Sequence, residues 1–391
     1  YEIRKLKGIK MGFIGMTLEG TPDIVSPEGI AGLRFLDEAE TANRYARILR
    51  RKHGVRAIVV LLHEGGVQSA PGSINDCNGI AGPIVDIVKR TDQEVDLFVT
   101  GHTHSAYNCV IDGRPVTSAS SFGRLITDID VTLDRRSRDV TRVAANNRVV
   151  SQDVPPAFAI TELIKRYDLL VAPLRDRVIG RISADITRTP DDSREHAAGN
   201  LIADAQLAST TPNGAVAAFM NPGGVRADFV AGQISGGEQP GEVTYGEAFT
   251  VQPFGNSLVT MDLTGAQVHE MLKQQWCEQT FPRVLLPSVG VKYTWDRNVA
   301  TAILGQPCAG AGNPVTSLTI GGEPVADDGK VWRITVNSFL AAGGDKFTVL
   351  AEGVNRVGGD VDVDALEEYL EPSVVGSPVA PPPLTRIDVT P

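Results

Sequence analysis

Residues 57–66 read AIVVLLHEGG, an unbroken apolar run that ends in a histidine, a glutamate and two glycines. A short continuous run of this kind is typical of a strand that is buried on both faces of a sheet. Residues 95–104, VDLFVTGHTH, repeat the arrangement with two histidines after the run. Both stretches therefore predict a buried strand that is followed directly by histidines.

Helices are expected around the first of these strands. Asp37 is placed as an N-cap with Glu40 three residues later, and Gly54 is placed to end the helix. A second helix is expected over about 80–90, and residues 10–16 predict an earlier strand. The order β-α-β-α-β indicates an α/β fold with parallel strands and right-handed crossovers. In such sheets functional groups gather beyond the carboxyl ends of the strands, where both histidine segments lie.

Three histidines at these strand ends are candidate metal ligands. Neutral imidazole is the commonest ligand of transition metals in proteins. His102 and His104 are two residues apart, and such residues point to the same side of an extended backbone. We therefore expect both of them to reach one metal centre together with His63. Spacing alone leaves open that these are three unrelated loop histidines.

The chain is expected to contain two α/β domains. Alternating residues predict a strand near 125–133, and Pro155-Pro156 precedes a helical stretch over about 158–178. Helix N-cap signals recur at Thr244 and Thr264. The expected boundaries are a first domain at 1–155, a connecting helix and hinge at 156–180, a second domain at 181–372 and a proline-rich tail at 373–391.

Composition narrows the class of protein. The net charge of −10 argues against nucleic acid as a partner. No apolar run approaches the roughly 18 residues of a membrane span. The four cysteines favour two local disulfides, Cys77–Cys109 and Cys277–Cys308, because each pair lies inside one expected domain. Disulfides predict an exported protein, whether secreted, periplasmic or held at the cell surface; four reduced thiols in a cytosolic protein are the alternative.

Several segments resemble one family. The two histidine segments resemble the last two metal motifs of calcineurin-like metallophosphoesterases. Four later segments resemble the 5′-nucleotidase C-terminal domain, namely REHAAGNL at 194–201, NPGGVR at 221–226, QPFGN at 252–256 and NSFLAAGGD at 337–345. The resemblance to the 5′-nucleotidase family implies a partial metallophosphoesterase α/β sandwich in the first domain. It also implies a nucleotide-binding α/β domain in the second.

The resemblance implies a centre of two divalent metal ions, of the Zn, Mn, Co or Mg type. His63 and His102 match ligands of one ion, and His104 matches a ligand of the other. Two neighbouring ions can clamp a phosphoryl group and lower the pKa of a bound water.

The resemblance also implies a nucleotide site in the second domain. Arg194 and Arg226 match residues that hold the phosphate and ribose side of the ligand, to which a guanidinium fork is suited. Asn221 and Gly224 match a loop that lies against the ligand. Because glycine has no side chain, the backbone can approach closely there.

Three further residues would hold the nucleoside. Phe254 and Phe339 match an aromatic clamp around the base, and Asp345 matches a carboxylate that accepts hydrogen bonds from the ribose hydroxyls. Either phenylalanine could instead serve only core packing, and Asp345 could be a turn residue after Gly343-Gly344.

Part of the family pattern is missing. The chain has no Asp-x-His, no Asn-His pair, and Gly-Asp pairs only in the second domain. The resemblance therefore implies that the chain is N-terminally incomplete, with its catalytic residues expected upstream of Tyr1. We expect the chain alone to be inactive and the missing segment to be a partner.

The function implied is that of a phosphoric ester hydrolase of the 5′-nucleotidase type, which releases nucleoside and phosphate from a nucleotide substrate. Two sister activities, 2′,3′-cyclic nucleotide phosphodiesterase and UDP-sugar hydrolase, use the same motifs and stay open. A non-catalytic nucleotide-binding module is the alternative from another class.

Overall fold

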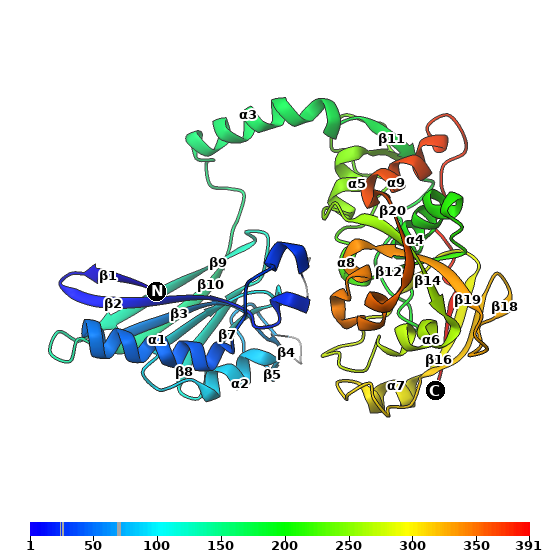
Figure 1. Cartoon of the computed structure of the whole chain (residues 1–391). Helices are drawn as coiled ribbons and strands as arrows, with labels where there is room; N and C mark the ends of the chain where they lie inside the picture. Colours follow the sequence, from blue (N-terminus) through cyan, green and yellow to red (C-terminus); the bar gives the residue numbers. More distant parts are fainter. Residues whose placement is uncertain (24, 26, 69–71) are drawn as a thin grey trace. The chain divides into compact units, whose positions relative to one another are not determined.

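The computed structural model describes residues 1–23, 25, 27–68 and 72–391 (Figure 1). The chain divides into two compact units, residues 1–22 with 31–156 and residues 157–391 with 23–30. No helix among the described residues is long and apolar enough to cross a membrane.

The first unit is built on a six-stranded sheet with the order β1-β2-β3-β6-β8-β7. Strands β2, β3, β6 and β8 run parallel, while β1 and β7 pair antiparallel at the two edges. The strands are β1 (Glu2–Leu6), β2 (Ile9–Thr17), β3 (Ala57–His63), β6 (Leu97–Thr100), β7 (Ala106–Ile111) and β8 (Arg114–Ala119). The parallel α/β arrangement expected from the sequence is confirmed.

Two helices, α1 (Glu38–His53) and α2 (Pro83–Arg90), pack their apolar sides on this sheet. The Asp37 side chain accepts a hydrogen bond from the Glu40 N–H, and Gly54 ends α1 at a φ of 63°. Both ends of α1 are therefore as expected. Helix α2 begins later than expected because Ile80–Ala81 forms a short strand, β5, with β4 (Val67–Gln68).

Strands β9 (Leu125–Leu133) and β10 (Val140–Val149) form an antiparallel ribbon. The ribbon packs against apolar residues of the six-stranded sheet that do not belong to the cluster formed with α1 and α2. Ile129 and Val143 of the ribbon contact a cluster that includes Met11, Val59 and Leu97. Strand β10 was not expected from the sequence. It lies in a mostly polar stretch, because only the face that packs on the sheet is apolar.

The second unit begins with α3 (Phe158–Arg175) and contains two main sheets. The five-stranded sheet has the order β15 (Leu286–Pro287), β12 (Ala217–Met220), β19 (Val331–Asn337), β14 (Ser257–Thr264) and β20 (Val354–Val361). The four-stranded sheet has the order β18 (Glu323–Pro324), β17 (Val315–Ile320), β16 (Val291–Asp296) and β21 (Ile387–Thr390). A two-stranded sheet joins β11 (Val178–Arg181) to β13 (Glu242–Thr244).

The described residues of this unit also form the α-helices α4 (Ala197–Thr210), α5 (Tyr245–Val251), α6 (Gly265–Lys273), α7 (Arg297–Ile303), α8 (Ser338–Ala341) and α9 (Asp362–Leu370). Thr244 with Glu247 and Thr264 with Gln267 form the two expected capping boxes. The main apolar core lies between the sheets, with Trp276, Tyr293 and Phe347 almost fully buried.

The end of the chain corrects one expected boundary. Residues 373–391 were expected to be a tail, but β21 pairs in parallel with β16. The Arg386 guanidinium, just before β21, makes a two-pronged contact with the Asp204 carboxylate at 2.7 Å for each oxygen. Both side chains are buried, so the last residues belong to the second unit's core.

Both expected disulfides are confirmed. Cys77 is bonded to Cys109, and Cys277 is bonded to Cys308. Each bridge lies inside one unit.

Candidate functional site

The two histidine segments lie side by side at the carboxyl ends of β3 and β6. The Gly101 N–H donates to the Glu64 carbonyl at 3.3 Å, and the Thr103 hydroxyl donates to the Gly66 carbonyl at 2.7 Å. A Cβ on Gly65 would stand 2.4 Å from the Gly101 carbonyl oxygen. Only glycine therefore allows the two segments to approach this closely.

This packing brings two of the three predicted ligands together. The His63 and His102 rings lie 5.3 Å apart between centroids, at an interplanar angle of 66°. The His104 ring instead contacts Phe122 at 5.3 Å. The backbone is left-handed at His102 (φ 65°) and His104 (φ 53°). Our expectation of extended backbone at these two residues is therefore wrong.

A metal site needs several potential ligand atoms that lie close to one another. Within the described ranges, two groups of three have ligand atoms within 4.8 Å of one another, and neither contains a histidine. One group depends on Cys277 and Cys308, whose sulfurs are joined in a disulfide. The other consists of Glu19, Asp37 and Glu38. Within the described residues, His63, His102 and His104 thus do not belong to a group of three clustered ligand atoms.

Glu64 is a residue of this region to which the sequence assigned no role. Its side chain is buried and accepts a hydrogen bond from the Gly65 N–H at 2.7 Å. Burial raises the pKa of the Glu64 carboxyl, and that hydrogen bond opposes the rise. Its place directly after the apolar run of β3 was the signal that could have marked it.

In the second unit, predicted site residues meet around a buried amide. Asn221 follows β12 and donates from Nδ2 to Oδ2 of Asp345 at 2.8 Å. The Asn221 side-chain oxygen accepts from Asn337 Nδ2 at 3.0 Å. Asp345 is buried, at a φ of 54°. The loop that follows β12 and the turn after α8 are thereby joined.

Glycines let the loop after β12 lie close to this network. A Cβ on Gly224 would stand 2.3 Å from the Met220 methyl carbon and 2.9 Å from the Asn221 side-chain oxygen. A Cβ on Gly223 would be 3.8 Å from Asp345 Oδ2. A side chain at position 224 would therefore displace Met220 or the Asn221 amide, and Gly223 borders the carboxylate.

The same loop carries Arg226, whose side chain contacts Phe254, the first of the two predicted aromatic residues. The Arg226 guanidinium donates to the Gly223 carbonyl at 3.2 Å and lies over the Phe254 ring at 5.7 Å. Phe254 is 57 % exposed, so its ring is accessible to a ligand. Phe254 is thus not a core residue.

Phe339 differs from Phe254 in its surroundings. It is partly buried and packs against the main core, and a Cβ on Gly344 would stand 2.5 Å from its ring. Gly344 directly precedes Asp345, so the Phe339 ring and the carboxylate share one turn. The expected core-packing role and the expected clamp role are both compatible with this position.

Arg194 lies to one side of that network. It is exposed and lines a hollow of about 390 Å³ together with Pro222 and Val225 of the Asn221 loop. Another lining residue, His196, is 5 % exposed. Its Nδ1 accepts from the Gly199 N–H at 3.0 Å. Burial, with the nearby Arg188 charge, lowers the pKa of His196 to about 4 and keeps the ring neutral.

One cation of the site was missed. Arg283 Nε lies 3.4 Å from Asp345 Oδ1, and its guanidinium stacks over Phe281 at 4.5 Å. Gln279, which also hydrogen-bonds to Arg283, donates to the Asp345 carbonyl at 2.7 Å. The segment Phe281-Pro282-Arg283 carried only a weak signal, an arginine next to an aromatic residue.

Comparisons with known proteins bear on this arrangement. Residues 178–352 match the family model described as 5′-nucleotidase, C-terminal domain. The chain is 29 % identical to endonuclease YhcR of Bacillus subtilis, over 95 % of this chain and 28 % of that protein. It is also 29 % identical to cell wall protein Lmo0130 of Listeria monocytogenes, over 95 % of this chain and 47 % of that protein. The chain thus spans less than half the length of these two relatives.

Among solved structures, the chain is similar to that of a 5′-nucleotidase precursor from Thermus thermophilus. The TM-score is 0.78 and the sequences are 28 % identical. The match covers 100 % of this chain and 74 % of that chain.

Proposed function

We infer from this chain's membership of the 5′-nucleotidase family that it takes part in the hydrolysis of nucleoside phosphates, with release of nucleoside and phosphate. The observation that supports this most directly is the hydrogen bond between Asn221 and Asp345. Gly223 of the same loop accepts from Arg226, which lies over the accessible Phe254 ring. A buried carboxylate linked in this way to an accessible aromatic face suits a ribose joined to a flat base.

Each predicted site residue of the second unit has a proposed role in nucleotide binding. Phe254 and Phe339 would stack on the base, and Asp345 would accept hydrogen bonds from the ribose hydroxyls. Asn221 holds the Asp345 carboxylate in place, and Gly224 keeps the loop close. Arg194 and Arg226 would face the phosphate side of the nucleotide.

The first unit would contribute to a centre of two divalent metal ions, of the Zn, Mn, Co or Mg type. We propose His63 and His102 as ligands of one ion, because their rings already lie together, and His104 as a ligand of the other. Bound metal would supply electrophilic stabilisation of phosphate charge. No group of three potential ligands in the described residues contains these histidines, so we propose that other residues complete the ligand set.

A second candidate function is a nucleotide-binding module without catalysis. It is favoured by one observation: no described group of three potential ligands includes His63, His102 or His104. The predicted nucleotide-binding residues all lie in the second unit, so nucleotide binding would not depend on the three histidines. For either function, the two disulfides suggest export, to a secreted, periplasmic or cell-surface location.

The test is to assay the 391-residue chain against AMP, ADP, UDP-glucose and a 2′,3′-cyclic nucleotide, with added Mn²⁺, Co²⁺ or Zn²⁺. We expect nucleotide binding, and turnover well below that of an intact family enzyme. Metal-dependent AMP hydrolysis that His63→Ala and His102→Ala abolish would support the hydrolase. Binding without any turnover would show that the 391-residue chain binds nucleotides but does not hydrolyse them by itself, and failure to bind any of these nucleotides would contradict both functions.

A further inference from the structure

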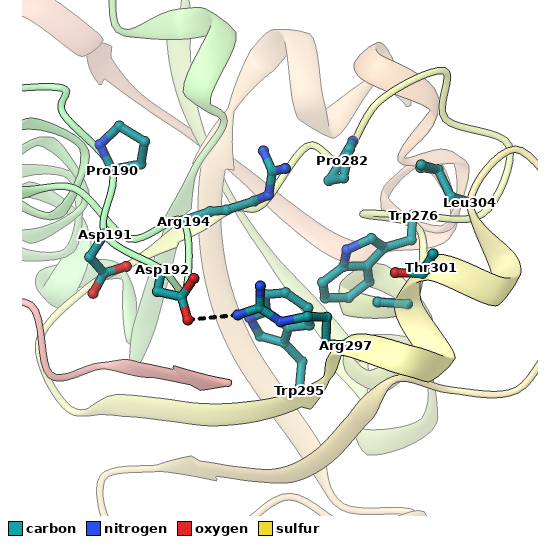
Figure 2. A pocket seen from close by; sticks show the side chains of 11 residues that line it. Pro190, Asp191, Asp192, Arg194, Trp276, Pro282, Trp295, Arg297, Thr301 and Leu304 are labelled. Atoms are coloured by element: carbon teal, nitrogen blue, oxygen red, sulfur yellow. Dashed lines mark hydrogen bonds and ion pairs between the residues drawn. The ribbon is translucent and has the colours of Figure 1, made fainter. Parts of the chain in front are cut away.

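A second hollow in the second unit has no role in the function proposed above. Its volume is about 430 Å³, within the range of small-molecule sites (Figure 2). The residues that matter here are Arg194, Trp276, Pro282, Arg297, Thr301 and Leu304. Phe254, Asn221 and Asp345 do not line it.

The hollow is lined by an indole whose N–H is not hydrogen-bonded within the described residues. Trp276 is 1 % exposed, and its indole N–H has no hydrogen-bond partner among the described residues. In Figure 2 the indole nitrogen lies on the side of the ring that faces Arg194. An acceptor bound in this hollow would therefore accept a hydrogen bond from the Trp276 N–H.

Two guanidinium groups border the same space. The Arg194 side chain has no ion pair among the described residues. Arg297 pairs with Asp192 Oδ2 at 2.6 Å and lies over the Trp295 ring at 6.0 Å. The other lining carboxylate, Asp191, is already engaged, because its Oδ1 accepts from the Ser193 and Glu195 N–H groups. The lining thus holds two guanidinium and two carboxylate groups, and Arg194 is the guanidinium without an ion pair among the described residues.

The remaining walls are apolar. Pro282, Ala300 and Leu304 line the hollow beside Trp276. A ligand that fits needs an anionic head with hydrogen-bond acceptors for the guanidinium groups and the indole N–H. It also needs an apolar body of about ring size for these walls.

We propose that this hollow binds a small organic oxyanion, with its charged head between Arg194, Arg297 and the Trp276 N–H. The site goes beyond the proposed nucleotide function, and it shares only Arg194 with it. A ligand in this hollow would bind Arg194, which is also proposed to bind the nucleotide phosphate. Occupancy should therefore weaken AMP binding and leave adenosine binding unchanged.

Tryptophan emission gives a direct readout, because two of the three tryptophans, Trp276 and Trp295, line the hollow. The third, Trp332, has a buried Nε1 with no partner among the described residues, so Trp332→Phe removes no hydrogen bond. In that background, emission reports on the hollow alone. The probes are phenyl phosphate and benzoate, which differ in their head group, and inorganic phosphate, which lacks the apolar body.

We expect a saturable emission change with phenyl phosphate or benzoate at millimolar concentrations, and weaker binding of inorganic phosphate. Arg297→Gln should weaken binding about tenfold, because a charge-assisted hydrogen bond is lost. Asp192→Asn should strengthen it, because Arg297 loses its competing partner. Arg148→Gln is the matched control, since it breaks an exposed pair with Asp128 in the first unit and changes the charge equally.

The proposal is overturned if none of the probes gives a saturable change, or if Arg297→Gln binds as tightly as the Arg148→Gln control. Weaker binding by Asp192→Asn would also contradict it. Measuring adenosine binding by the Arg297→Gln variant shows whether the hollow and the nucleotide site are distinct. Unchanged adenosine affinity is expected, and a parallel loss would place Arg297 in the nucleotide site instead.

Discussion

Asn221 donates a hydrogen bond of 2.8 Å to Asp345 across 124 residues of sequence. The Asn221 oxygen accepts from Asn337, whose own side-chain oxygen caps α8 at the Leu340 N–H. The amide is thus held on both sides, and the carboxylate is held by the amide and by Arg283. A network that is satisfied in this way keeps Asp345 in place before a ligand arrives.

Replacing Phe254 by alanine should weaken adenosine binding by about 1–3 kcal/mol, because one stacking face is lost. Its 57 % exposure means that folding stability should change little. Phe122→Ala is a matched control, since Phe122 is also exposed and also lies under an arginine, Arg124. Calorimetric titration of adenosine measures the effect; equal affinity in the two variants would remove Phe254 from the base site.

Asp345→Asn tests the ribose contact without disturbing the backbone, because asparagine tolerates a φ of 54°. Loss of a hydrogen bond to a charged acceptor should weaken adenosine binding by about 1.5–3 kcal/mol. The wild-type chain should prefer adenosine to 2′,3′-dideoxyadenosine, and the variant should lose that preference.

Asp112→Asn provides the control for Asp345→Asn. Asp112 also has left-handed backbone, at a φ of 49°, and pairs with an arginine, Arg114, in the first unit. If Asp345→Asn still discriminates between the two nucleosides as the control does, Asp345 does not contact the ribose.

Breaking the Arg386–Asp204 pair should cost about 3–5 kcal/mol of the free energy of unfolding, because one buried charge stays uncompensated. Arg386→Met is the variant, and chemical denaturation is the measurement. Arg148→Met, which breaks the exposed pair with Asp128, should cost about 0–1 kcal/mol. Similar losses in the two variants would show that the end of the chain does not stabilise the second unit.

The folding stability should carry a pH dependence from His196. Its pKa falls from 6.5 to about 4 in the folded chain, chiefly through burial. The unfolded chain therefore gains a proton first as the pH falls below about 6.5, and stability is lost toward pH 4 at up to about 1.4 kcal/mol per unit. His196→Asn keeps an N-cap acceptor but does not titrate, so it should lose less stability over that window.

Denaturation of both proteins at about pH 7 and about pH 5 measures the difference. Asp96 and Asp362, whose pKa values burial raises to about 7 and about 6, titrate in both proteins and cancel in the comparison. Equal pH slopes would mean that His196 is protonated in the folded chain as readily as in the unfolded one.

The parts of the fold that depend on local chemistry could be predicted from the sequence. Asp37 and Gly54 mark the ends of α1 because a cap hydrogen bond and a left-handed glycine are properties of a few neighbouring residues. The apolar runs of β3 and β6 likewise indicate burial on both faces. In the same way, the pairing of each cysteine inside one unit followed from sequence distance.

Features that depend on distant partners could not be predicted. Strand β21 is specified by its pairing with β16 and by the Arg386–Asp204 contact, across 182 residues. Arg283 reaches Asp345 only because the chain folds back. The left-handed backbone at His102 and His104 is imposed by loop packing, which histidine itself does not signal. The resemblance supplied candidate residues for the site, but not the network that holds Asp345.

We propose that the second unit binds a nucleoside through Phe254, Phe339 and Asp345. The most direct test is calorimetric titration of adenosine into the 391-residue chain with a chelator present. We predict saturable binding of one adenosine per chain that needs no metal and is lost in the Phe254→Ala/Asp345→Asn double variant. Absence of binding, binding that requires metal, or undiminished binding by the double variant would contradict the account.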